Sequence, residues 1–270
     1  MHPTLPLLRL TNPILTVSTY KHYVLFLLCC LLSPIIVAQP KQTLKAVTVD
    51  GNYPYNFVCD RQVQGIVVNV GKELANRLNL EFKVELVPWT RALYRAKTES
   101  KLMAFSVARI PEREDHYYWI GPVASNEEWL FKLKSRADIR LQNIKDAQGY
   151  LVGDVAGSAG LPTFAKLGIK VDTAPSMLSN CKKLKLGRID LVALDPEGIS
   201  RFAAHCQIPV DNLEKTVRLP LDNVLYFVFG KSTPLDFIQQ VEKEIAGMIK
   251  DQTISRINKQ WKADELTEKE

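Results

Sequence analysis

Along most of the chain, short apolar stretches alternate with segments whose apolar residues recur at helical spacing. Stretches typical of strands lie at residues 44–49, 82–87, 102–107, 150–154, 189–194 and 224–229, and a short extended segment lies at 169–172. Helical spacing is found at 67–78, 89–97, 176–186, 198–205 and 235–261, with an expected break near Lys250 in the last region. Strands that alternate with helices predict an α/β fold with mostly parallel sheets.

The first 38 residues follow a different pattern. They contain two basic residues, Arg9 and Lys21, no acidic residue, an apolar run at 23–32 and the small residue Ala38. This order is typical of a secretory signal, and we expect cleavage after Ala38. The apolar run is shorter than the roughly 20 residues that span a bilayer. An uncleaved membrane anchor is the alternative, because the lead before the run is long for a signal.

Length and composition narrow the class of protein. With 270 residues, of which 46% are hydrophobic, the chain is long enough for one large or two ordinary domains. The 35 Lys and Arg against 29 Asp and Glu give a net charge of +6, which falls to +4 without the predicted signal. The charges are interspersed, and there is neither a basic helix nor zinc-finger spacing. We therefore expect no nucleic-acid partner.

Three cysteines follow the predicted signal, namely Cys59, Cys181 and Cys206. Export would place them in an oxidising compartment, where a disulfide persists. Cys181 and Cys206 belong to predicted helices on either side of the strand at 189–194, so a bridge is geometrically feasible. The sequence leaves a Cys181–Cys206 disulfide and two free buried thiols as open alternatives, with Cys59 unpaired.

Motifs for catalysis are missing. The sequence has no G-x-S-x-G, no G-x-G-x-x-G and no P-loop. Beyond the predicted signal the histidines are His116 and His205, and neither has metal-ligand spacing around it. We therefore expect no catalytic residue, no metal and no cofactor.

Residues that follow the predicted strands offer recognition chemistry instead, because open α/β sheets bind ligands at the carboxyl ends of their strands. Arg113, in the segment ARIPERE, offers a planar fork for a carboxylate. Asp195 ends the apolar run IDLVAL and could accept an ammonium group. Gly157 and Ser158 open a helix, so their N–H groups and the hydroxyl could hold an anion. The alternatives are a surface ion pair for Arg113 and helix N-caps for Asp195 and Ser158.

Aromatic residues near the same strand ends could form the walls of a pocket. Trp89 and either Tyr53 or Tyr55 are candidates, with core packing as the alternative for each. Ser106 and Arg109 also lie at a strand end. A pocket with an aromatic wall, one Arg and one Asp suits a small zwitterion.

The order of several segments resembles the family 3 extracellular solute-binding proteins, which are the periplasmic receptors of polar-amino-acid ABC transporters. The segments are YPYNF, GIVVNVGKELANRLN, VPW, ARIPERE, GPV, VGDVAGS, LGRIDLVALD and INKQW. The resemblance implies that Arg113 holds the ligand α-carboxylate, that Asp195 takes the α-ammonium group and that Gly157 and Ser158 form the second lobe's turn. It also assigns Ser106 as a ligand-binding hydroxyl, and Tyr53 or Tyr55 together with Trp89 as the aromatic wall.

Some positions depart from the family pattern. Ala108 and Ile110 stand where Thr or Ser is usual, and Arg109 is an additional cation. Arg109 either favours an acidic ligand or faces solvent.

The resemblance also implies the architecture and the function. We expect a two-lobed type II periplasmic-binding-protein fold with two crossing hinge strands, lobe 1 at 39–129 and 223–270, and lobe 2 at 130–222. The expected protein is a periplasmic monomer that binds an amino acid between its lobes and delivers it to an ABC permease. A ligand-sensing module and a dehydratase-type enzyme on the same scaffold are the alternatives.

Overall fold

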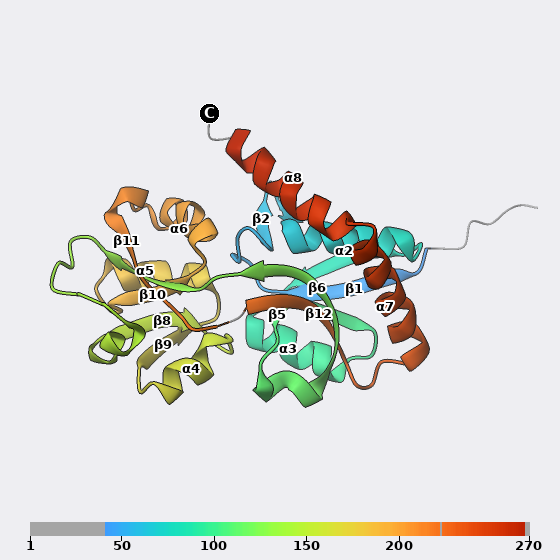
Figure 1. The fold of residues 1–270 in the computed structure, drawn as a ribbon, viewed down its shortest axis with the longest axis horizontal. Coiled ribbons are helices and arrows are strands. Elements are labelled where there is room, and N and C mark those ends of the chain that lie inside the picture. Colours follow the sequence, from blue (N-terminus) through green and yellow to red (C-terminus); the bar gives the residue numbers. More distant parts are fainter. Residues whose placement is uncertain (1–40, 222, 268–270) are drawn as a thin grey trace, which may run out of the picture. The chain divides into compact units, whose positions relative to one another are not determined.

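The structure, a computed structural model, describes residues 41–221 and 223–267, so the predicted signal and its cleavage site lie outside the described residues. Two five-stranded sheets, ordered β4-β1-β5-β12-β6 and β11-β7-β10-β8-β9, each carry their own helices (Figure 1). We call the first sheet with its helices lobe 1 and the second lobe 2. Both sheets are mixed: four strands of each run in one direction, and β12 in the first sheet and β7 in the second run in the opposite direction. The predicted α/β class is confirmed.

Lobe 1 is built from two separate parts of the chain. Its elements are β1 (Thr43–Thr48), the hairpin β2 (Phe57–Cys59) and β3 (Gln62–Gln64), α2 (Ile66–Arg77), β4 (Glu81–Leu86), α3 (Trp89–Thr98), β5 (Leu102–Ala108), the 3₁₀ turn η1 (Pro111–His116), β6 (Tyr117–Asn126), β12 (Asn223–Gly230), α7 (Leu235–Lys250) and α8 (Thr253–Thr267). The break expected near Lys250 separates α7 from α8.

Lobe 2 is the continuous stretch between these parts. It contains β7 (Trp129–Leu133), η2 (Ile144–Gly149), β8 (Leu151–Val155), α4 (Gly160–Lys166), β9 (Lys170–Ala174), η3 (Met177–Ser179), α5 (Asn180–Lys185), β10 (Leu191–Leu194), η4 (Pro196–Gly198), α6 (Ile199–Cys206), η5 (Val210–Asn212) and β11 (Leu213–Arg218). The chain thus passes from one sheet to the other between β6 and β7 and returns between β11 and β12. The predicted lobe limits lie near these crossings and stay a prediction.

The apolar pattern explains how the layers of lobe 1 pack. All seven residues of β5 are buried, because helices cover both faces of the sheet. Met103 and Phe105 pack on the side of α2 and α7, whereas Leu102 and Ala104 pack on the side of α3. Figure 1 shows α2 and α3 on opposite sides of this sheet. The continuous apolar run at 102–107 therefore follows from burial on both faces.

A bulge interrupts this strand near the candidate residue Ser106. The pairing of β5 with β12 shifts by one residue between Ala104 and Val107, so two residues of β5 face one residue of β12. Ser106 has φ +60°, in the left-handed region that costs a residue with a Cβ about 1–2 kcal/mol. Bulges of this kind redirect a side chain and are frequent beside functional sites.

Several strands were missing from the sequence prediction, namely β2, β3, β6, β7 and β11. In β6 the buried residues recur every third position rather than every second, which hides the strand period. None of the helices within 41–221 and 223–267 has the length and apolar character needed to cross a membrane.

Cys181 and Cys206 form a disulfide, with their Cα atoms 5.1 Å apart. It joins α5 to α6, and both half-cystines are buried in the core that lies beneath these helices. Cys59 is a free cysteine in the β2–β3 hairpin. Of the two alternatives that the sequence left open, the structure contains the bridge.

Replacing both half-cystines by alanine is expected to lower the free energy of unfolding by about 3 kcal/mol, because the bridge restricts the unfolded chain. Urea unfolding under non-reducing conditions measures this difference. A Cys59→Ser control is expected to stay within about 0.5 kcal/mol of the unmodified protein. A double variant as stable as this control would contradict the prediction.

Candidate functional site

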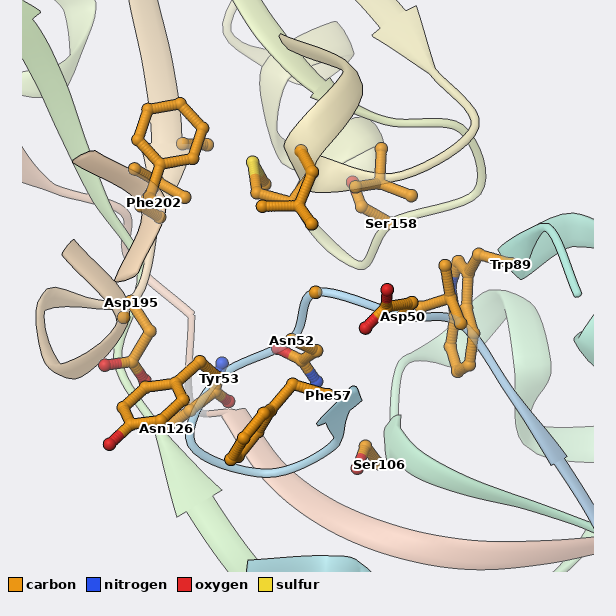
Figure 2. A pocket seen from close by; sticks show the side chains of 18 of the residues that line it. Asp50, Asn52, Tyr53, Phe57, Trp89, Ser106, Asn126, Ser158, Asp195 and Phe202 are labelled. Carbon is orange, nitrogen blue, oxygen red and sulfur yellow. The ribbon is translucent and has the colours of Figure 1, made fainter. Parts of the chain in front are cut away.

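A cavity of about 410 Å³ lies between the two lobes, at the carboxyl ends of β1, β5, β8 and β10. Six of the predicted binding residues line it: Tyr53, Trp89, Ser106, Arg113, Ser158 and Asp195. Figure 2 shows Asp50 and Asp195 well apart, with Asn52 between them. The fold thus brings together predicted residues that are up to 142 positions apart in the sequence, from Tyr53 to Asp195.

Arg113 is a buried cation on the wall of this cavity, only 8% exposed. It sits in η1, and its Nη1 donates to Ala108 O at 2.9 Å while Nη2 donates to Gly157 O at 2.5 Å. Burial lowers the pKa of Arg113 to about 10. Within the described part of the chain no carboxylate forms an ion pair with it. The surface ion pair considered as the alternative is not formed, and Arg113 keeps N–H groups that can bind an anion.

Arg109 does not line the cavity. Its guanidinium pairs with Glu114 on the exposed surface and lies 5.5 Å from the ring centre of Trp119 and 5.9 Å from that of Tyr226. The hydrogen bonds to Glu114 raise the pKa of Arg109. Arg109 pairs with Glu114 because the short η1 turn between them brings Glu114 back beside Arg109. Of the two alternatives for this residue, the surface position is the one observed.

Asp195 follows β10 and lies on the lobe 2 side of the cavity. Its Oδ1 accepts from Glu197 N at 2.8 Å, which caps η4, and its Oδ2 lies 2.9 Å from the Tyr55 hydroxyl and 3.3 Å from Glu127 N. Burial raises the pKa of Asp195 to about 6 although these hydrogen bonds oppose the shift. The cap and the cavity position are therefore compatible, and both apply.

Tyr55 is not a wall of the cavity. It is 2% exposed in the core of lobe 1, and its hydroxyl lies near Ser125 O as well as Asp195. Burial, followed by the charge of Asp195, raises its pKa. Tyr53 lines the cavity instead, since it belongs to the loop that turns Tyr55 inward. Core packing was the correct alternative for Tyr55.

The turn between β8 and α4 is engaged by both lobes. Gly157 is not on the cavity surface, but its carbonyl accepts from Arg113 and, at 3.1 Å, from Trp89 Nε1. Ser158 N–H donates to Val155 O at 3.0 Å, and the Ser158 hydroxyl donates to Asp154. The two Ser158 hydrogens that we expected to hold an anion are thus directed to protein acceptors. An anion-binding role for Gly157 and Ser158 stays a prediction.

Several cavity residues were missed by the sequence argument. Asp154 is the last residue of the predicted strand YLVGD, and Asp50 directly follows the predicted strand at 44–49, so the strand-end rule could have found both. Phe57 and Phe202 give two further aromatic surfaces, from the unrecognised hairpin and from α6. Arg201 packs 4.2 Å from the ring centre of Phe57.

Three oxygen atoms on the cavity wall have no hydrogen-bond partner among the described residues: Thr48 Oγ1, Ser106 Oγ and Asn126 Oδ1. Thr48 and Ser106 are 0% and 7% exposed. A buried polar atom without a partner costs about 1–3 kcal/mol. The cavity thus offers a small polar molecule an arginine, several carboxylates and the polar residues Thr48, Ser106 and Asn126.

No group of His, Cys, Asp and Glu side chains in residues 41–221 and 223–267 is arranged to hold a metal ion. His205 lines the cavity, and His116 lies in η1.

Comparison with known proteins agrees with this architecture. The L-cystine-binding protein TcyA of Bacillus subtilis (strain 168) is 20% identical over 234 residues, which cover 84% of each chain. An ancestral arginine-binding protein bound to arginine matches with a TM-score of 0.70 and 18% identity, over 82% of this chain and 98% of that one. A histidine kinase sensor domain with similarity to periplasmic binding proteins matches with a TM-score of 0.71 and 14% identity, over 82% and 96%.

The sequence profile of the bacterial extracellular solute-binding proteins, family 3, matches residues 44–264, which include both lobes and every residue of the cavity. The chain belongs to this family.

Proposed function

We propose that the protein binds a single amino acid with a positively charged side chain in the cavity and delivers it to an ABC permease. The observation that carries this proposal is Arg113, a buried guanidinium with no carboxylate partner among the described residues, on the wall of a cavity that also contains Asp195. Arg113 is assigned to the α-carboxylate of the ligand and Asp195 to its ammonium group. A relative that binds cystine and a structural neighbour that binds arginine support an amino-acid ligand.

The size of the cavity suits this ligand. Small-molecule pockets are about 300–1,000 Å³, and 410 Å³ leaves room for a long side chain next to the zwitterion. Trp89 and Phe202 offer flat surfaces on which such a side chain can pack (Figure 2).

The charges on the wall favour a cation. Four carboxyl groups line the cavity, those of Asp50, Glu128, Asp154 and Asp195, against the guanidinium groups of Arg113 and Arg201. Arg201 is engaged by Val58 O at 2.7 Å and by the ring of Phe57. A cationic side chain would reduce the excess of negative charge, and its attraction is strong in a site with little water.

Contacts across the cavity support closure of the lobes around the ligand. Gly157 O of lobe 2 accepts from Trp89 and Arg113 of lobe 1, and Arg201 of lobe 2 donates to Val58 O of lobe 1. We assign the hinge to the two crossings between the sheets, with the lobe limits near 129/130 and 222/223. Ligand that binds both walls favours the closed arrangement, which a permease can recognise.

We place this function in the periplasm, after export through the signal at 1–38, and in a monomer. Sensing and dehydratase activity remain the alternative functions. Ligand-stimulated transport by a permease of the same ABC class in proteoliposomes would support delivery over sensing.

The ligand proposal is tested by a thermal-shift screen of the exported protein with the common L-amino acids, followed by calorimetry. L-Arginine or L-lysine is expected to raise the melting temperature most, because a ligand that binds only the folded state stabilises it. Tighter binding of L-glutamate would contradict the preference for a cation. If no amino acid raises the melting temperature, the assignment to amino acids is wrong.

Arg113→Lys is expected to weaken binding of the best amino acid by about 100-fold, equivalent to about 3 kcal/mol, because lysine keeps the charge but loses the planar fork. Calorimetry measures the dissociation constants. Arg109→Lys is the matched control, since Arg109 is an exposed arginine of the same segment outside the cavity, and its affinity is expected to change less than twofold. Equal losses in the two variants would argue against a ligand contact at Arg113.

Ser106→Gly is expected to raise the free energy of unfolding of the unliganded protein by about 1 kcal/mol while weakening ligand binding. It removes a left-handed residue with a Cβ and a buried hydroxyl without a partner, and these gains outweigh the flexibility that glycine adds to the unfolded chain. Urea unfolding and calorimetry measure the two effects. Ser106→Ala keeps the backbone conformation and so isolates the hydroxyl. Loss of stability in both variants would contradict this account.

A further inference from the structure

A buried carboxylate lies behind Ser158 on the lobe 2 wall of the cavity. Asp154 ends β8, is 1% exposed and lines the cavity. Its Oδ1 accepts from Val155 N at 2.6 Å, and its Oδ2 accepts from the Ser158 hydroxyl. In the described residues no Lys, Arg or His forms an ion pair with it. Asp154 is therefore a buried acid whose one side-chain partner is a hydroxyl that also faces the cavity.

The position of this carboxylate is tightly constrained. Asn180, which is fully buried, donates its Nδ2 to Asp154 O at 3.2 Å. This bond holds the backbone at the end of β8, and the carboxylate itself is held by the hydrogen bonds from Val155 N and the Ser158 hydroxyl.

The ionisation of Asp154 decides what Ser158 offers to the cavity. A hydroxyl has one hydrogen, and an ionised carboxylate can only accept. With Asp154 ionised, the Ser158 hydrogen points to Asp154 and only the oxygen lone pairs of Ser158 face the cavity. With Asp154 protonated, the acid can donate to Ser158 Oγ and the Ser158 hydrogen is released toward the cavity.

We propose that Asp154 is a positioning residue that turns Ser158 into an acceptor for an N–H group of the ligand, so that protonation of Asp154 weakens binding of a cationic amino acid. This inference rests on the proposed amino-acid function. It gives the Ser158 hydroxyl an acceptor role in place of the anion-binding role expected from the sequence, and it names Asp154 and Ser158 as the pair that links ligand binding to pH. The test below separates failure of this link from failure of the function.

Burial supports a titration in an accessible range. It raises the pKa of Asp154 to about 6, although the hydrogen bonds from Ser158 and Val155 oppose the shift. The other ionisable groups that face the same cavity are Asp50, Tyr53, Arg113, Glu128, Asp195, Arg201 and His205. Asp195 also has a pKa raised to about 6. A comparison with an Asp154 variant is therefore needed to separate the two acids.

The elements packed against β8 carry further charges, which are exposed or paired elsewhere. Lys183 of α5 pairs with Asp172 of β9, and Asp190 before β10 pairs with Arg136. The exposed groups on the elements around β8 are Lys145, Asp146, Lys166, Lys170, Lys182 and Lys185. The pKa of Asp154 is shifted by burial and by its hydrogen bonds rather than by these charges.

The test compares the protein with Asp154→Asn, using L-arginine as the probe in calorimetry from pH 5.0 to 8.0. Asparagine has the same shape, is always neutral and donates to Ser158 Oγ. If only the ionised acid permits tight binding, a group of pKa about 6 weakens binding about tenfold at pH 5.0 relative to pH 8.0. Asp154→Asn is expected to bind L-arginine more weakly than the unmodified protein at pH 8.0 and to lack the tenfold change that comes from Asp154. Parallel pH profiles would overturn the proposal.

Two further variants identify the hydroxyl as the link. Ser158→Ala is expected to weaken binding at pH 8.0 and to lack the tenfold change that comes from Asp154. Ser158→Thr keeps a hydroxyl and is expected to retain both the affinity at pH 8.0 and that change. Asp172→Asn is the matched control, because it neutralises an aspartate of the neighbouring strand outside the cavity. Its profile is expected to run parallel to that of the unmodified protein. A structural role of Asp154 alone would lower affinity without changing the shape of the profile.

A measurement without ligand keeps the inference testable if L-arginine does not bind. Because the pKa of Asp154 is raised from 3.8 to about 6 in the folded state, its favourable contribution is complete below about pH 3.8 and is lost as the pH rises through 6. The urea midpoint of Asp154→Asn is therefore expected to rise relative to the unmodified protein between pH 5.0 and 8.0. Parallel midpoints would overturn the proposal, whereas rising midpoints without amino-acid binding would refute the proposed function alone.

Discussion

The cavity depends on one buried guanidinium, that of Arg113, which forms no ion pair with a carboxylate among residues 41–221 and 223–267. Removing a charge from water is costly unless hydrogen bonds or an opposite charge compensate it. Arg113 receives only partial compensation, from Ala108 O in its own lobe and Gly157 O in the other. An anionic group of a ligand would supply the rest. Arg113 therefore links the two lobes, and its incompletely compensated charge favours binding of an anionic group.

The turn at Gly157 is the part of lobe 2 that contacts Arg113. Its carbonyl accepts from Arg113 and Trp89, so the backbone of lobe 2 is positioned by two side chains of lobe 1. The same turn carries Ser158, whose hydroxyl is directed by Asp154. Movement of the lobes relative to each other would change the contact at Arg113 and the place of Ser158 together. Ligand binding and lobe closure thus use the same few atoms.

The sequence was sufficient for the parts of the site that depend on strand ends. Arg113 follows a strand of the first sheet and Asp195 a strand of the second, and the carboxyl ends of strands from both sheets face the cavity. The sequence was insufficient where a side chain could point either into the cavity or away from it. Tyr53 and Tyr55 occupy one loop, and only the packing of lobe 1 shows that Tyr55 turns inward. Arg109 was ambiguous for the same reason, because its contact with Glu114 depends on how η1 turns.

Asp154 shows a different limit of sequence reasoning. Its place at a strand end was visible, but an aspartate there is usually interpreted as a solvated cap, and burial is a property of the folded lobe. The buried carboxylate of Asp154, and the hydroxyls of Thr48 and Ser106 that have no hydrogen-bond partner among the described residues, destabilise the unliganded fold. The apolar cores under both sheets and the bridge between α5 and α6 must offset that cost. A cavity that is selective for a polar ligand needs buried polar groups, and a fold that is stable without ligand needs apolar cores and a disulfide to offset their cost.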